Sequence, residues 1–565
     1  MQYTTREKEG GTLQKSEKSK VEIAEEYRRK GMLDDAILIL RECIREDRDN
    51  TDAYILLMDV LLQTDDIPGA RDVAKNLEEV VSGREDEAEI LLRIAEVFAY
   101  YEEVKDALHY VNESLRIKPT AEGWNLRGNL MFLMDRYENA LRCYNEALKL
   151  NGNNEEVWNN KGFIHFVLQE YDKAIEHFKK AIEINPDYRS AYYNLAYTYH
   201  AMNELDKAIE YYEKSLDIDP NDEVCWNNLG NAYYNLGRYM ESIPYFMFSL
   251  LVNQKYEIAW NNIGNALDKM GFHEISIFFH DKAIECNPKF DYAWYAKGYA
   301  NYKLGNKKKA YQYVMKALSL NDSNDYAWNL LAKLYWEEGD LIEEAIDAAK
   351  KAVEINPENI DNLKTLYEFL KESGRIYDAR KILEKIIDKA EGEEKGRWLM
   401  EAGRYEDALN YLKGKEKMEC LFVLGKYEDI VESAGDGEEL YYKAMAYVEM
   451  EKYEDALKTL EKIPEEMWDD RYKEIKMVCM AHLGYRINIR DVLKLSTKSA
   501  LRICSALYDS GRISEAKKIL EKLRRRGEEE PLIYRILSDI YEREGKIKIA
   551  RRYRLIYRGF ANEKI

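Results

Sequence analysis

The sequence has no run of apolar residues that approaches the roughly 18 needed for a membrane-spanning helix, so a transmembrane protein is not expected. Its first twenty residues lack the apolar centre of a secretory signal. The seven cysteines are scattered singly, with no Cys-x-x-Cys pair, which argues against a disulfide framework and a zinc site. We therefore expect a cytoplasmic protein with no membrane partner, no metal and no cofactor.

Motifs of common catalytic sites are also missing. The sequence has no Gly-x-x-x-x-Gly-Lys-Ser/Thr phosphate loop and no Gly-x-Gly-x-x-Gly after a strand. His273-Glu274 begins like the zinc-binding helix of a metalloprotease, but Ile277 takes the place of the second histidine. His273 and His280 could share one face of a helix, but no third metal ligand lies nearby in the sequence. We therefore interpret both histidines as ordinary helix residues. We identify no catalytic residue and expect a protein that is not an enzyme.

Charged residues and tyrosine are abundant instead. Of 565 residues, 34% are charged and 46% are hydrophobic, which is typical of a folded and strongly hydrated chain. Glutamine occurs only six times, whereas Glu, Lys, Arg and Tyr are frequent. That balance is typical of proteins from hot environments.

An aromatic residue recurs with a period of 34 through the middle of the chain. Its seven occurrences are Trp124, Trp158, Tyr192, Trp226, Trp260, Trp294 and Trp328. A glycine or alanine follows four residues after each, and turn signals such as Asn185-Pro186 and Asp219-Pro220 close the units. Between these marks the apolar residues have helical spacing. One unit is therefore predicted to be a helix, a short turn near Gly237 or Gly271, and a second helix.

The repeat resembles the tetratricopeptide repeat family in period and residue types together. The unit over 223–256 carries the family's Trp226, Leu229, Gly230, Tyr233 and Phe246. The match is strongest from about 121 to 359 and weakens outward. The resemblance implies an all-α fold, an α-α superhelix of about 16 helical hairpins in which each repeat contacts its neighbours.

The repeat spacing also predicts the organisation of the chain. We expect a flexible polar tail over 1–19, diverged repeats over 20–120, and regular repeats over 121–390. The Tyr-Glu-Asp motifs that follow Gly403, Gly425 and Glu451 lie 22 and 26 residues apart, so shorter helices and an altered curvature are predicted over 391–470. Repeat-like units with a basic character and a cap are expected over 471–565.

Asparagine and tyrosine fill the positions that face the concave groove in this family, one, two and five residues after the aromatic anchor. Seven anchors give twenty-one such positions, and Lys333 is the only charged residue among them. An asparagine amide both donates and accepts, so it can pair with the backbone of an extended peptide. The candidate groove residues are Asn125, Asn129, Asn159, Asn160, Tyr193, Asn194, Tyr197, Asn227, Asn228, Asn231, Asn261, Asn262, Asn265, Tyr295, Tyr299 and Asn329.

Four of these asparagines form a ladder with one member per repeat. The ladder of Asn160, Asn194, Asn228 and Asn262 is similar to those of O-linked N-acetylglucosamine transferases and kinesin light chains. That resemblance implies a grip on a peptide backbone. The alternative is that the asparagines are inherited from the family consensus, because the idealised repeat tends to have asparagine at two of these places.

Basic residues gather at the C-terminal end. Residues 471–565 hold 24 Lys and Arg against 12 Asp and Glu, whereas the whole chain has a net charge of −20. The candidate basic residues are Arg524, Arg525, Arg526, Arg551, Arg552, Arg554 and Arg558. They are interpreted either as a docking site for an acidic partner, namely RNA, the ribosome or an acidic protein, or as the solvated cap of the array.

These observations predict a non-enzymatic scaffold or adaptor that holds an extended peptide or a partner protein in a neutral groove. The first alternative is a nucleic-acid- or ribosome-associated factor that acts through the basic end. The second is a regulatory subunit of an enzyme complex. The identity of the partner does not follow from the sequence.

Overall fold

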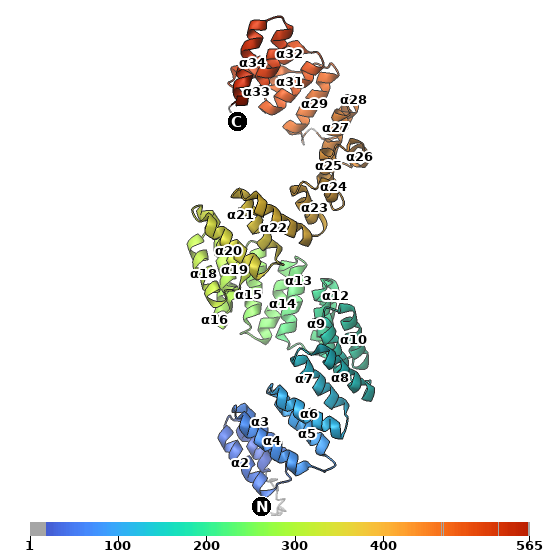
Figure 1. Ribbon diagram of the computed structural model, residues 1–565, viewed down its shortest axis with the longest axis vertical. Helices are drawn as coiled ribbons and strands as arrows, with labels where there is room; N and C mark the ends of the chain where they lie inside the picture. Colours follow the sequence, from blue (N-terminus) through green and yellow to red (C-terminus); the bar gives the residue numbers. More distant parts are fainter. Residues whose placement is uncertain (1–18, 465, 467, 529, 563–565) are drawn as a thin grey trace, which may run out of the picture. The chain divides into compact units, whose positions relative to one another are not determined.

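The computed structural model describes residues 19–464, 466, 468–528 and 530–562 (Figure 1). Within these residues there are 34 helices and no strand, which confirms the all-α prediction. The polar tail expected over 1–19 lies outside the described residues except for Ser19, whose hydroxyl caps the first helix. In the part of the chain that is described, no helix is both long and apolar enough to cross a membrane.

The chain divides into two compact units, Met1–Tyr313 and Val314–Ile565. The helices of the first unit are α1 (Lys20–Arg29), α2 (Leu33–Glu46), α3 (Thr51–Gln63), α4 (Ile67–Val81), α5 (Glu87–Tyr100), α6 (Val104–Ile117), α7 (Ala121–Leu133), α8 (Tyr137–Leu150), α9 (Glu155–Val167), α10 (Tyr171–Ile184), α11 (Arg189–Ala201), α12 (Leu205–Ile218), α13 (Glu223–Asn235), α14 (Tyr239–Val252), α15 (Glu257–Lys269), α16 (His273–Cys286) and α17 (Asp291–Lys303). The boundary between the units falls within α18 (Lys307–Leu320).

The helices of the second unit follow the same pairwise order. They are α19 (Asp325–Glu338), α20 (Ile342–Ile355), α21 (Ile360–Glu372), α22 (Ile376–Lys389), α23 (Gly392–Glu401), α24 (Tyr405–Ala408), α25 (Gly414–Val423), α26 (Tyr427–Ser433), α27 (Glu439–Glu449), α28 (Tyr453–Leu460), α29 (Asp470–His482), α30 (Ile489–Val492), α31 (Thr497–Asp509), α32 (Ile513–Arg525), α33 (Pro531–Arg543) and α34 (Ile547–Asn562).

A regular hairpin is built from local signals. The Asp222 carboxylate accepts the backbone N–H of Cys225 and so begins α13. Gly237 then turns the chain in the left-handed region (φ 76°), and α14 begins at Tyr239. Gln169 adopts the same conformation (φ 60°) at the equivalent turn without a glycine. The hairpin geometry therefore fixes this turn more strongly than the residue type does.

The small residue four places after each aromatic anchor allows the two helices of a hairpin to approach closely. A Cβ atom added at Gly230 would lie 2.6 Å from Cε1 of Phe246, which is fully buried on α14. Gly128 meets Tyr144 and Gly162 meets Phe178 in the same way. A side chain at these places would overlap a ring that has no space to move. The predicted close helix contact is therefore confirmed at these glycines.

The second helix of the hairpin shortens within the second unit. It has 4 residues in α24, 7 in α26 and 8 in α28, compared with 14 in α14. The compressed spacing of the Tyr-Glu-Asp motifs predicted these shorter helices. A further short second helix, α30, has only 4 residues and was not predicted.

Candidate functional site

The first asparagine after the aromatic anchor is buried wherever it occurs. Asn125, Asn159, Asn227 and Asn261 in the first unit and Asn329 in the second are at most 8% exposed. Their amides bond to neighbouring helices: for example, Asn125 Nδ2 donates to Glu156 Oε1 (2.9 Å), and Asn329 Nδ2 donates to Thr365 Oγ1 (3.1 Å). Four of these side chains therefore join consecutive repeats, whereas Asn261 contacts His280 within its own hairpin, and all five present little surface to a ligand.

The second asparagine of each repeat completes an internal ladder along α7, α9, α11, α13 and α15. Its Nδ2 group donates to a side chain of the preceding repeat. The donors and acceptors are Asn160 to Asn125 (3.2 Å) and Asn129 (3.1 Å), Asn194 to Asn159 (2.9 Å), Asn228 to the Tyr193 hydroxyl (2.9 Å), and Asn262 to Asn227 (2.9 Å) and Asn231 (3.2 Å). The sequence placed these residues on one face but did not reveal that they bond to one another.

The ladder asparagines keep one functional atom on the surface. Asn160, Asn194, Asn228 and Asn262 are half-buried, and none of their Oδ1 atoms accepts a hydrogen bond from a residue of the described structure. Because the internal bond fixes each amide through Nδ2, its carbonyl oxygen has a set direction. The row consequently offers one oriented acceptor per repeat.

A line of aromatic rings lies beside the ladder on α7, α9 and α11. Phe132 contacts Phe163 (ring centroids 5.6 Å apart), Phe163 contacts Phe166 (6.1 Å), and Phe166 contacts Tyr197 (5.3 Å), whose ring stacks on Tyr193 (6.2 Å). Phe163 and Tyr197 are 37% and 43% exposed. Phe132 and Phe166 were missed because they lie eight residues after the anchor, one helical turn beyond the predicted positions.

The ladder oxygens and this aromatic line together are called the asparagine face. Of the other predicted residues, Asn265 is half-buried, and Tyr295 and Tyr299 have ring centroids 6.4 Å apart on α17. Asn329 belongs to the second unit. The asparagine face thus runs from α7 to α15 within the first unit.

The two histidines of α16 belong to a buried polar cluster. Asp268 lies within hydrogen-bond distance of His273 Nδ1 (2.8 Å) and His280 Nε2 (3.1 Å), and it accepts the Ser276 hydroxyl. The other ring nitrogen of His280 is 2.9 Å from Asn261 Oδ1. His280 is fully buried at the place that Phe246 occupies in the preceding repeat. Both of its ring nitrogens are engaged within the protein, so it serves the core.

The basic residues predicted at the C-terminal end separate into two groups. Arg524 pairs with Glu521 (2.9 Å), Arg554 pairs with Glu542, and Arg526 donates to the Leu493 carbonyl (2.8 Å). The remaining members are exposed and form no ion pair among the described residues. They are Arg525, Arg551, Arg552 and Arg558. Only this second group is available in full to an acidic partner.

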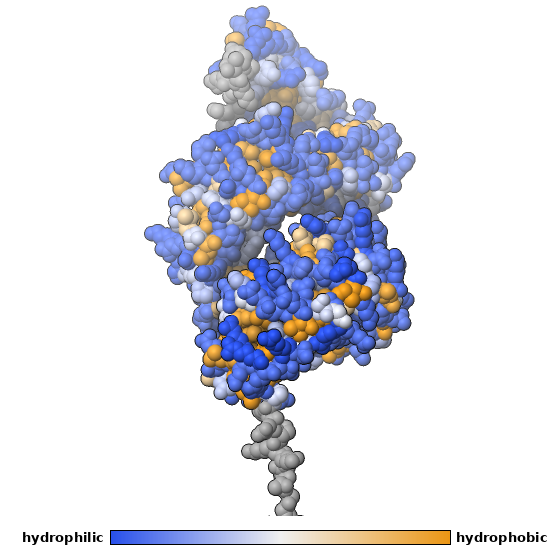
Figure 2. Space-filling model, turned by 60° about the horizontal axis from the view of Figure 1, so that its bottom comes forward, coloured by the Kyte–Doolittle hydropathy of each residue, from blue (hydrophilic) through white to orange (hydrophobic). Residues whose placement is uncertain are grey.

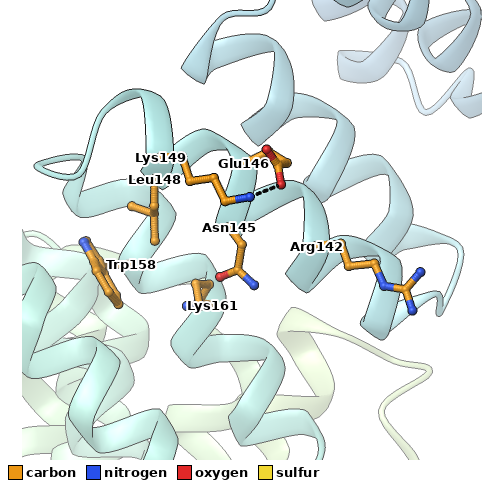
Figure 3. Close-up of a pocket in the computed structure, with 7 residues that line it drawn as sticks. All are labelled: Arg142, Asn145, Glu146, Leu148, Lys149, Trp158 and Lys161. Atoms are coloured by element: carbon orange, nitrogen blue, oxygen red, sulfur yellow. Dashed lines mark hydrogen bonds and ion pairs between the residues drawn. The ribbon is translucent and has the colours of Figure 1, made fainter.

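A hollow of about 480 Å³ lies between α8 and α9 (Figure 3). The Lys161 ammonium lies 4.9 Å from the centre of the Trp158 ring, and Lys149 pairs with Glu146 (2.6 Å). Arg142 extends away from this group in the view. Burial lowers the pKa of Lys161. The residues that line the hollow include no serine, threonine, cysteine or histidine.

Family models described as tetratricopeptide repeat match residues 121–154, 153–221, 211–243, 291–324, 326–359 and 440–466. These parts of the chain are tetratricopeptide repeats. The repeats form a protein-interaction scaffold. The last match lies in the segment with shortened helices, so the family pattern continues there.

Solved structures with a similar fold include YrrB, described as a tetratricopeptide repeat protein with an unusual peptide-binding site. It is 20% identical over 33% of this chain and 95% of YrrB, with a TM-score of 0.28. MamA is 24% identical over 30% of this chain and 94% of its own (TM-score 0.28). Yeast Tom70 is 16% identical over 69% and 96% (TM-score 0.41). Among curated proteins the sequence has no match.

Proposed function

We propose that the chain is a non-enzymatic adaptor whose asparagine face binds an extended peptide segment of a partner protein. The supporting observation is the row of oriented Oδ1 atoms on Asn160, Asn194, Asn228 and Asn262. Each can accept one backbone N–H of a ligand without contacting its side chain. Because the amides are already fixed by internal bonds, binding costs little side-chain entropy.

The aromatic line supplies the apolar contacts of this proposal. Exposed rings at interfaces give a large contact area at a small entropic cost. Phe163 and Tyr197 project beside the ladder, so a peptide on the oxygens would place side chains against them. The neutral face favours a ligand segment with no strong net charge, because a buried unpaired charge is costly.

The internal ladder also explains much of the asparagine pattern without a ligand. Each Nδ2 bond joins two repeats, so asparagine at these places contributes to the fold whether or not a peptide binds. The proposal therefore depends on the two features that the fold does not use, namely the surface Oδ1 atoms and the exposed rings.

The test begins with selection of peptides from a random display library on the full chain. A selected peptide is then labelled, and its affinity is measured by fluorescence anisotropy. Phe163→Ala with Tyr197→Ala should weaken binding about tenfold or more, since truncating a central aromatic contact typically costs over 1 kcal/mol. The matched control is Tyr377→Ala, because Tyr377 is exposed on α22 in the second unit. Equal affinity of the double variant and the control contradicts the proposal.

A second candidate function is association with an acidic partner at the C-terminal end, namely RNA, the ribosome or an acidic protein. The observation that favours it is the set of exposed arginines that form no ion pair among the described residues, which includes Arg551, Arg552 and Arg558. RNA bound there should dissociate steeply as salt rises from about 50 to 200 mM, through counterion release. Arg551→Gln with Arg552→Gln should flatten that dependence. An unchanged dependence on salt would leave these residues as a solvated cap.

A further inference from the structure

The short helix α30 leaves one side of α29 uncovered. Gly484 (φ 78°) ends the first helix of this hairpin as Gly237 (φ 76°) does in the α13–α14 hairpin. That register aligns Lys473, Met477 and Met480 with Trp226, Gly230 and Tyr233. In the regular hairpin Trp226 and Tyr233 pack on Tyr245 of α14, with ring centroids 6.3 and 4.7 Å apart. A four-residue α30 cannot provide an equivalent cover.

The uncovered side of α29 is a pocket of about 500 Å³. Four aliphatic side chains give it an apolar lining, and four cations, two acids, Trp468 and Asn488 line the rest. The aliphatic residues are Met477, Met480, Ile487 and Leu495, the cations are Lys473, Lys476, Arg486 and Lys494, and the acids are Asp470 and Asp491. Methionine side chains adapt to apolar groups of different shapes. The pocket can therefore accept an apolar side chain that arrives with negative charge around it.

A second hollow of about 430 Å³ adjoins the first, and Lys494 lines both. Its other cations come from α30 and from the end of α32, namely Arg490, Lys522, Arg525 and Arg526. The two hollows together are called the basic pocket. Its described lining contains eight cations and two acids, so it attracts anions strongly.

Most of these cations have no acidic partner among the residues that the structure describes. Lys473 pairs with Asp470 (3.6 Å) and Lys494 pairs with Asp491 (2.9 Å). Lys476, Arg486, Arg490, Lys522 and Arg525 form no ion pair with any described residue. A charge-rich surface with unpaired cations steers oppositely charged partners toward it.

We propose that the basic pocket binds an acidic peptide segment that carries an apolar side chain. The apolar side chain would enter between Met477 and Met480, and flanking carboxylates would pair with the arginines and lysines of the rim. Arginine suits this role because its planar guanidinium binds a carboxylate through two parallel hydrogen bonds.

The lining favours a peptide over single-stranded nucleic acid. Proteins that bind single strands stack the bases on aromatic faces. The only aromatic residue of the described pocket lining is Trp468. The Lys476 ammonium lies over the Trp468 ring, 4.7 Å from its centre. The indole N–H of Trp468 donates to the Ile463 carbonyl (3.0 Å). An aliphatic lining offers bases no equivalent surface.

This site is separate from the asparagine face, because all its residues belong to the second unit. Failure of one proposal would therefore leave the other intact. Variants of Phe163 and Tyr197 should not alter binding at the basic pocket, and variants of Arg490 and Arg525 should not alter binding at the asparagine face.

The experiment uses the full chain and a fluorescein-labelled oligo-glutamate peptide with two central leucines. The affinity of the peptide is measured by fluorescence anisotropy at about 50 mM salt. Arg490→Glu with Arg525→Glu should weaken binding about tenfold or more, because reversing charges at an interface creates repulsion. The matched control is Arg380→Glu with Arg535→Glu, which reverses two exposed arginines on α22 and α33 that line neither hollow. Arg490→Gln with Arg525→Gln should have a smaller effect in the same direction.

The apolar contribution is tested with the same peptide lacking its leucines and with Met480→Gln, each of which should weaken binding severalfold. Three results would overturn the proposal. The labelled peptide could fail to bind at about 50 mM salt, the low end of the range where charge contacts are strong. The control variant could weaken binding as much as the pocket variant does. Finally, oligouridylate could bind more tightly than the peptide with the same dependence on Arg490 and Arg525, which would identify a nucleic-acid site.

Discussion

Replacing Asn262 by alanine tests the internal ladder most directly. The Asn262 amide donates to Asn227 Oδ1 (2.9 Å) and Asn231 Oδ1 (3.2 Å) across the contact between α15 and α13. Asn227 is 3% exposed, so water cannot easily replace the lost donor. The variant should therefore weaken the contact between these two repeats.

The expected magnitude combines two opposing effects. A buried acceptor left without its donor costs about 1–3 kcal/mol. Alanine returns about 0.5 kcal/mol because it is the better helix former. The variant Asn262→Ala should thus lower the free energy of unfolding by about 0.5–2.5 kcal/mol. The matched control is Asn145→Ala on α8, because Asn145 is an exposed helical asparagine without a hydrogen bond to the described chain and should show only the stabilising effect.

The assay combines urea unfolding with hydrogen exchange of α13 and α15, because a repeat array does not unfold in a single step. A double-mutant cycle with Asn227→Ala isolates the pair. The double variant should be more stable than the sum of the single effects predicts by at least about 0.5 kcal/mol. Strict additivity, or an Asn262→Ala protein as stable as the Asn145→Ala control, would refute a stabilising role for the ladder.

Three further predictions concern the core and the thiols. Gly264→Ala should lower the free energy of unfolding by about 2 kcal/mol, because the new Cβ would lie 2.4 Å from the fully buried His280 ring. Thermal unfolding measures this change, and an unchanged midpoint contradicts the packing argument. Burial lowers the pKa of His177 from 6.5 to about 4, so the unfolded chain binds the proton first and stability should fall as pH drops from 6.5 to 4. His177→Phe should flatten that part of the profile, and an identical profile would exclude His177 as its cause. Burial raises the pKa of Cys225 to about 12, and six of the seven cysteines are buried, so a thiol reagent at neutral pH should label at most Cys286 in the native protein; rapid labelling of several thiols would contradict the described burial.

The sequence alone determined the architecture, because residues close together in the chain specify each repeat. The 34-residue period, the helical spacing of apolar residues and glycines such as Gly230 each report on contacts within one hairpin. Such contacts join residues that are close in the chain, so their residue types follow the period. The shortened helices near Gly403 and Gly425 were predictable for the same reason.

Tertiary structure decided how each asparagine is used. Asn227 and Asn228 are adjacent and identical in type, yet one is buried and the other keeps its Oδ1 atom on the surface. A helix rotates by about 100° per residue, so burial depends on where the neighbouring helices pack. Hydrogen bonds such as Asn262 to Asn227 join residues 35 positions apart and have no local signal.

The basic pocket likewise exists only because of packing between elements. Lys473 and Arg525 lie far apart in sequence, and the sequence grouped only the arginines that are close in the chain. The short α30 exposes α29, and the hollow beside α29 is joined through Lys494 to a second hollow that residues of α30 and the end of α32 line. Local patterns thus specify which helices form, whereas surfaces built from several helices depend on the side chains that remain uncovered after those helices pack.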